Sequence, residues 1–168
     1  MMEIRKARTE DAAGIQKVCA DGNRSTYPGL LPQHEIERVI KKFYNEQRIL
    51  DEIENINQEW NGWFVAVDED EVVGAGGGGF TGEEVAEVFV LYLDPARKYQ
   101  GIGTQLLEAI TDDQKNRGAH TQWVSVAKDN RMAIPFYEAR GFVFQYEEPA
   151  YDMPEDSEHM SVRYMRKL

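Results

Sequence analysis

The chain has 168 residues, of which 42% are apolar, and this length predicts one domain over residues 1–168 with a core that needs no disulfide or structural metal. Its 30 acidic and 19 basic residues give a net charge of −11, which argues against nucleic-acid or anionic-membrane partners and suits a cationic substrate. A single cysteine, no apolar run of membrane-spanning length and no leader-like N-terminus predict a cytoplasmic protein.

The first half of the chain predicts helices followed by a strand meander. After a short strand over residues 4–7, a helix places Ile15, Val18 and Cys19 on one face, where Cys19 is expected to be an apolar core residue. Residues 23–32 contain Pro28, Gly29 and Pro32 and predict a loop. The helical repeat over residues 36–53 fits one long helix or two short ones. Strands are expected over residues 63–67, 72–80 and 85–93.

The second half predicts a helix between two parallel strands. Helical spacing after Pro95 ends at Gly118, and a strand follows over residues 122–127. This strand–helix–strand unit implies a right-handed crossover and one parallel pair. A short helix over residues 131–140 and final strands over 142–146 and 160–165 complete the chain. The expected fold is α/β (α+β): a single mixed, mostly antiparallel sheet of about seven strands with helices on both faces.

A glycine-containing segment from Leu91 to Thr104 runs from a strand through a basic loop into a helix. The first amides of a helix lack internal partners and favour an anion, and Gly101 and Gly103 leave room for a phosphate. No Gly-Lys-Ser/Thr follows, which argues against a P-loop, and Leu106 stands where a dinucleotide fingerprint needs its third glycine. On this spacing alone, an ordinary strand-to-helix turn is the better interpretation. The Gly76–Gly79 run lies within a strand, so it predicts a bulge or close backbone approach rather than a phosphate loop.

Two motifs resemble the GNAT superfamily of N-acetyltransferases. The run Lys98-Tyr99-Gln100-Gly101-Ile102-Gly103 is similar to the Arg/Gln-x-x-Gly-x-Gly/Ala signature that holds the pyrophosphate of coenzyme A, with Lys98 in place of the usual Arg or Gln. Residues Asn130 to Phe142 resemble the family's Asn-x-x-Ala-x-x-Phe-Tyr-x-x-x-Gly-Phe helix. The resemblance is good over residues 60–146, loose in the N-terminal helices, and limited to element type in the last 20 residues.

The resemblance implies a GNAT-like acyl-CoA N-acyltransferase fold and an enzyme that transfers an acetyl group from acetyl-CoA to an amine. The acceptor would be a small cationic amine, a polyamine or a peptide N-terminus, attacking directly in a ternary complex, and homodimers are common in the family. Coenzyme A is expected in a splay between the strands over residues 85–93 and 122–127. No metal is expected, since His34, His120 and His159 lack ligand spacing. The implied cofactor-binding residues are Leu91, Tyr92, Leu93, Lys98, Tyr99, Gln100, Gly101, Ile102, Gly103, Thr104, Asn130, Ala133 and Phe136.

Three further residues receive roles from the resemblance. The family places a tyrosine beside the thioester sulfur, which makes Tyr137 the expected general acid, although spacing alone favours a core aromatic. Glu87, expected on one strand face with Phe89 and Leu91, is the candidate general base, and a solvated strand edge is an equally good interpretation. Tyr27 is expected to contact the acceptor, with a plain loop anchor as the alternative. A non-catalytic coenzyme A sensor is the competing function, and the presence of Tyr137 favours the enzyme.

Overall fold

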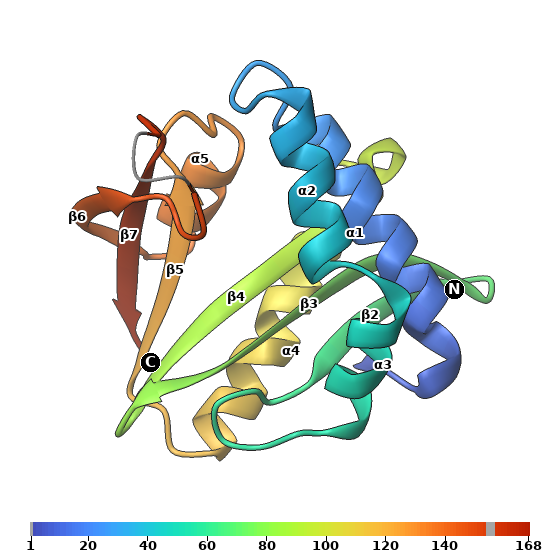
Figure 1. Cartoon of the computed structure of the whole chain (residues 1–168). Helices are drawn as coiled ribbons and strands as arrows, with labels where there is room; N and C mark the ends of the chain where they lie inside the picture. The colour runs from blue at the N-terminus through green and yellow to red at the C-terminus, as the bar shows by residue number, and fades with distance from the viewer. Residues whose placement is uncertain (1, 154–156) are drawn as a thin grey trace.

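The computed structural model describes residues 2–153 and 157–168, which form one sheet with helices on both faces (Figure 1). The strands are β1 (Met2–Lys6), β2 (Trp63–Asp68), β3 (Glu71–Gly82), β4 (Val85–Leu93), β5 (Thr121–Ala127), β6 (Val143–Pro149) and β7 (Met160–Lys167). The α-helices are α1 (Ala12–Thr26), α2 (Gln33–Phe43), α3 (Glu46–Glu54), α4 (Ile102–Asn116) and α5 (Ala133–Glu138). The strand order is β1-β2-β3-β4-β5-β7-β6, and β4–β5 is the parallel pair, which confirms the predicted mixed sheet.

Each face of the sheet has its own hydrophobic core, and the alternation of β2 contributes to both. Phe64 and Ala66 pack with α4 and α5 on one face. Trp63 and Val65 pack with α1 and α3 on the other, in a cluster that also contains Cys19. Cys19 is fully buried, and burial raises the pKa of its thiol, so it has the predicted apolar role. None of the helices in the described ranges is long and apolar enough to cross a membrane.

Asparagine side chains lie at several helix boundaries, two of which differ from the sequence prediction, while the predicted alternative of two short helices over residues 36–53 is confirmed. The expected loop over residues 23–32 is wrong at its start, since α1 continues to Thr26. Asn23 tolerates this position because its buried Nδ2 donates to the Cys19 carbonyl at 2.8 Å. Asn45 caps a separate α3, because its side chain accepts from the Arg48 amide at 2.9 Å. The helix expected over residues 131–140 is shorter, with Asn130 Oδ1 accepting the Met132 and Ala133 amides before it.

Strands β4 and β5 separate partway along their length (Figure 1). They pair from Val85 with Thr121 to Val88 with Val124. Beyond that point β4 pairs only with β3, and β5 pairs only with β7, among the described residues. The later half of β4 therefore presents backbone donors and acceptors toward β5 that the sheet leaves unsatisfied.

A β-bulge in β4 lies at the point of separation. Gly77 pairs with Val90 and Gly78 pairs with Val88, which leaves Phe89 as an extra residue in β4. The bulge reverses the alternation of side chains, because Val88 packs in the core beneath α4 whereas Val90 packs in the core beneath α1.

The bulge corrects one expectation and confirms another. Glu87 and Leu91 do not share a face, since Leu91 packs against the α4 core and Glu87 lines a cleft on the opposite side. A Cβ atom at Gly78 would lie 2.0 Å from the Glu87 carbonyl oxygen, and one at Gly79 would lie 1.9 Å from the Glu59 carbonyl oxygen. The glycine run therefore permits close backbone approach, as predicted.

Candidate active site

The gap where β4 and β5 separate is called the splay. The first turn of α4 presents free amides at the end of this splay. Gly101 is its N-cap with φ +79°, a left-handed conformation that glycine adopts without strain. The amide of Gln105 is bonded to the Gly101 carbonyl at 3.1 Å. In the part of the chain that the structure describes, the amides at positions 102–104 have no such partner. These three amides and the positive end of the helix dipole form a seat for an anion.

The walls of this seat come from β4, the preceding loop and α5. A Cβ atom at Gly103 would lie 3.4 Å from Leu93 and from Phe136, so glycine there lets α5 pack closely on α4. Lys98 Nζ reaches Met132 Sδ at 3.7 Å, across the gap between the loop and α5. Tyr99 is 93% exposed beside the seat.

The predicted cofactor-binding residues lie on three segments, and Ile102 among them is buried in the core beneath α4. On the open half of β4 are Leu91, Tyr92 and Leu93. In the loop and the first turn of α4 are Lys98, Tyr99, Gln100, Gly101, Ile102, Gly103 and Thr104. At the start of α5 and just before it are Asn130, Ala133 and Phe136. Arg97, the other cation of the loop, is instead bonded to Asp68 at 2.8 Å.

Tyr137 lies in α5 with only 9% of its surface exposed. Its ring makes edge contacts with Phe136 and Phe142, at centroid distances of 5.1 and 5.3 Å. Burial raises the pKa of its hydroxyl, and the Tyr27 phenol raises that pKa further. Within residues 2–153 and 157–168 no hydrogen-bond partner occupies the hydroxyl. Tyr137 therefore keeps its hydroxyl proton at neutral pH, and the described residues leave that donor free.

A cleft of about 870 Å³ opens on the sheet face that α1, α2 and α3 cover. Its wall includes Tyr27, whose hydroxyl lies 3.4 Å from that of Tyr92. The Tyr92 hydroxyl in turn donates to Asn23 Oδ1 at 3.3 Å. The structure thus places Tyr27 in the cleft.

Glu87 also lines the cleft, but Arg163 occupies its carboxylate. Arg163 Nη1 and Nη2 donate to the two Glu87 oxygens at 2.7 and 2.8 Å, and the side chains are only 14% and 11% exposed. Arg163 stands opposite Ser125 in the β5–β7 pairing, so the ion pair joins β4 to β7 across β5. Sequence reasoning missed Arg163, because 76 positions separate it from Glu87 and no local pattern marks the pair.

Comparison with known proteins identifies the family. Residues 27–142 match the acetyltransferase (GNAT) family over more than half of the chain. The chain belongs to this family. The open half of β4, the amide seat and the buried tyrosine are thus elements of a GNAT domain.

Individual relatives of this GNAT chain differ in their acceptors. The [ribosomal protein bS18]-alanine N-acetyltransferase of Escherichia coli (strain K12) is 40% identical over 57 residues, which span 34% of this chain and 38% of that relative. The spermidine N(1)-acetyltransferase of Thermoplasma acidophilum is 27% identical over 145 residues, covering 84% of this chain and 88% of that relative. The structure of PaiA N-acetyltransferase from Thermoplasma acidophilum in complex with coenzyme A has a TM-score of 0.83 and 24% identity, covering 100% and 99% of the two chains. This last likeness shows the fold.

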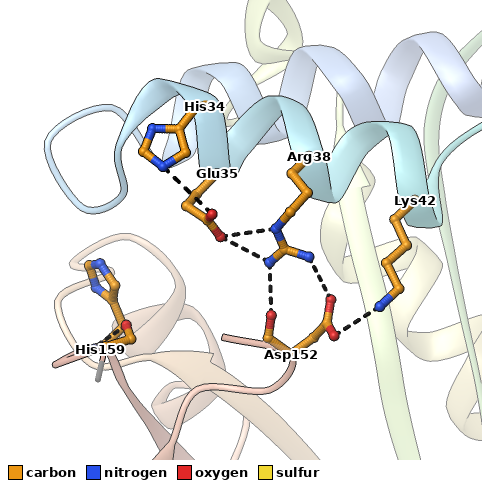
Figure 2. A network of polar contacts seen from close by, with 7 residues as sticks. His34, Glu35, Arg38, Lys42, Asp152 and His159 are labelled. Atoms are coloured by element: carbon orange, nitrogen blue, oxygen red, sulfur yellow. Dashed lines mark hydrogen bonds and ion pairs between the residues drawn. The ribbon is translucent and has the colours of Figure 1, made fainter. Parts of the chain in front are cut away.

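A polar network ties α2 of the GNAT domain to the connection between β6 and β7 (Figure 2). Arg38 Nη1 and Lys42 Nζ each donate to the Asp152 carboxylate at 2.9 Å, and Arg38 Nη2 donates to Glu35 at 2.9 Å. Hydrogen bonds from Lys42 and then from Arg38 lower the pKa of Asp152. Both α2 and this connection line the cleft, so the network fixes two of its walls relative to each other.

Proposed function

We propose that this chain transfers an acetyl group from acetyl-CoA to a primary amine by direct attack in a ternary complex. The observation that carries the proposal is the splay of β4 and β5, which ends at the free amides of α4 and passes the buried Tyr137. On one face of the splay, these features suit the binding of a phosphorylated cosubstrate. The cleft on the other face is then available to the acceptor.

The residues present fit coenzyme A as the cosubstrate. The amides at positions 102–104 would hold its diphosphate, and Lys98 would add a positive charge beside them. The unpaired edge of β4 at Tyr92 and Leu93 would bond the pantetheine amides in the manner of an added strand. A backbone amide of the same edge would stabilise the negative charge that develops on the acetyl oxygen.

The reaction needs two proton transfers, and each requires a donor or an acceptor in the site. An amine with a pKa near ~10.4 must lose a proton before it attacks the thioester, and the departing thiolate must gain one. We assign the second transfer to the Tyr137 hydroxyl, which keeps its proton at neutral pH. Glu87 stays a prediction as the base. The Arg163 guanidinium binds both oxygens of the Glu87 carboxylate and so weighs against that role, and we assign water in the cleft as the immediate proton acceptor.

The acceptor side suits a cationic amine. The chain carries a net charge of −11, and the hydroxyls of Tyr27 and Tyr92 line the cleft where an ammonium group can donate to them. The relatives include enzymes named for a spermidine acceptor and for the alanine of a ribosomal protein. We therefore propose a small cationic amine, a polyamine or a peptide N-terminus as the acceptor, with a cytoplasmic location.

A thiol-release assay with acetyl-CoA and a panel of amines tests the proposal. Tyr137→Phe should lower turnover by roughly 10²–10⁴ while acetyl-CoA still binds, because only the proton donor is lost. Full turnover in this variant would reject the assigned role. Binding of acetyl-CoA without thiol release on any amine would instead support a sensor.

A further inference from the structure

One end of the acceptor cleft is built around Glu52 of α3. The Trp60 indole donates to the Glu52 backbone carbonyl at 2.9 Å, and the Trp63 indole donates to Glu52 Oε1 at 3.1 Å. Glu52 is thus fixed through both its backbone and its side chain. Its side chain is only 24% exposed, and Glu52 lines the cleft together with both tryptophans.

The surroundings of this carboxylate suit a cation. Tyr44 and Trp60 line the cleft together with Glu52, and the faces of aromatic rings attract ammonium groups. Trp63 is only 2% exposed and acts on Glu52 through its indole donor. A carboxylate has about four acceptor sites, and the side-chain contacts of Glu52 are one indole and Arg48 Nε at 3.4 Å. Acceptor capacity therefore remains for a ligand that enters the cleft.

We infer that Glu52 and its tryptophans bind a second cationic group of the acceptor, so that the substrates are unbranched amines with an ammonium group at each end. The inference rests on the proposed function, because it needs the first amine at the splay. Trp63, whose indole binds Glu52, pairs with Gly77, and Gly77 pairs with Val90 beside the bulge, so the backbones of Trp63 and Val90 are two strand spacings apart, about 9–10 Å. With single bonds of about 1.5 Å, a chain of roughly six or seven methylene groups spans that distance.

Arg48 lies one turn before Glu52 in α3 and provides a second test of the inference. Its side chain is 45% exposed, and its guanidinium lies 5.0 Å from the Phe43 ring. A second cation bound by Glu52 would be repelled by Arg48. Removal of Glu52 and removal of Arg48 should therefore have opposite effects on a diamine, whereas a purely structural ion pair would give both removals the same effect.

The experiment compares 1,7-diaminoheptane with heptylamine in the thiol-release assay. We expect Glu52→Gln to reduce the ratio of kcat/KM for the diamine to that for the monoamine by about tenfold or more, mostly through KM. Arg48→Gln should raise this ratio. Glu54→Gln is the matched control, because it removes the same charge from an exposed position of α3 and should leave the ratio unchanged.

Three outcomes would overturn the inference. Equal falls of the ratio in Glu52→Gln and Arg48→Gln would mean that the pair only supports α3. A fall of kcat by the same factor for both amines in Glu52→Gln would mean that Glu52 handles the proton. An unchanged ratio in Glu52→Gln would remove the subsite. If the wild-type protein acetylates no amine of the panel, the proposed function fails separately, and calorimetric binding of the diamine decides the inference. About tenfold weaker binding in Glu52→Gln than in Glu54→Gln would support it, and equal binding would refute it.

Discussion

Gly101→Ala is the most direct test of the anion seat. Gly101 has φ +79°, and an L-residue in the left-handed region costs about 1–2 kcal/mol. The added methyl group meets nothing closer than Gln105 Nε2 at 3.9 Å, so backbone strain is the main effect. For a chain of 168 residues, this strain should lower Tm by about 2–8 °C.

The same strain should weaken the binding of coenzyme A. The free variant can relax residue 101 toward negative φ, which turns the amides at positions 102–104 away from the ligand. Binding must then restore the strained backbone, so the affinity should fall by up to the strain itself, about 5–30-fold. Calorimetry with coenzyme A measures this loss directly.

Gly118→Ala is the matched control, because it strains the opposite end of the same helix. Gly118 has φ +100° and no atom within 4 Å of an added Cβ. The variant should lose a similar amount of stability while coenzyme A binds with wild-type affinity. The seat would be refuted if Gly101→Ala lost stability but kept full affinity for coenzyme A, or if both variants lost affinity equally.

Three further predictions concern titration and ion pairing. Burial raises the pKa of Tyr137 above the usual ~10, so the pH profile of kcat/KM should show no descending limb between about pH 8 and 10. A descending limb in this range that disappears in Tyr137→Phe would contradict the assignment of Tyr137 as the general acid. Arg163→Met leaves the Glu87 carboxylate buried without its partner and should cost about 3–5 kcal/mol in urea unfolding, with partial recovery on adding Glu87→Gln. The pKa of Asp152 is lowered in the folded chain, so Asp152 stabilises the fold above its unfolded pKa of about 3.9 and loses this effect as the pH falls through the folded value. The difference in unfolding midpoint between wild type and Asp152→Asn should shrink below about pH 4, and a difference that grows would refute the role of the network.

The backbone geometry at the start of α4 and before α5 was largely predictable because local backbone rules determine it. A glycine in the left-handed region, an asparagine that caps a turn and a helix whose first amides are free each leave a sequence signature within a few residues. Gly101 and Asn130 have these roles in the structure. Strand periodicity likewise predicted the sheet, since β1, β5 and β7 place alternate residues against the core beneath α4, and β2 alternates between the two cores.

The bulge at Phe89 shows why alternation failed on the acceptor side. A single extra residue reverses every later side chain of β4, and the reversal depends on pairing with Gly77 and Gly78 of another strand. The glycine run predicted that a bulge or a close approach would occur. It could not say that β4, rather than β3, would carry the extra residue.

The acceptor cleft was not predictable because its chemistry comes from pairs that are distant in sequence. Glu87 looked like a free carboxylate until β7 brought Arg163 to it. Glu52 carries no local sequence signature, because its indole donor, Trp63, comes from β2. Each carboxylate takes its function from the partner that the fold supplies: a guanidinium makes Glu87 part of the framework at the vertex of the splay, and indole donors leave Glu52 able to accept from a ligand. These two glutamates differ only in their tertiary contacts. Mutating the partner of each glutamate therefore shows whether that glutamate stabilises the fold or binds a ligand in this cleft.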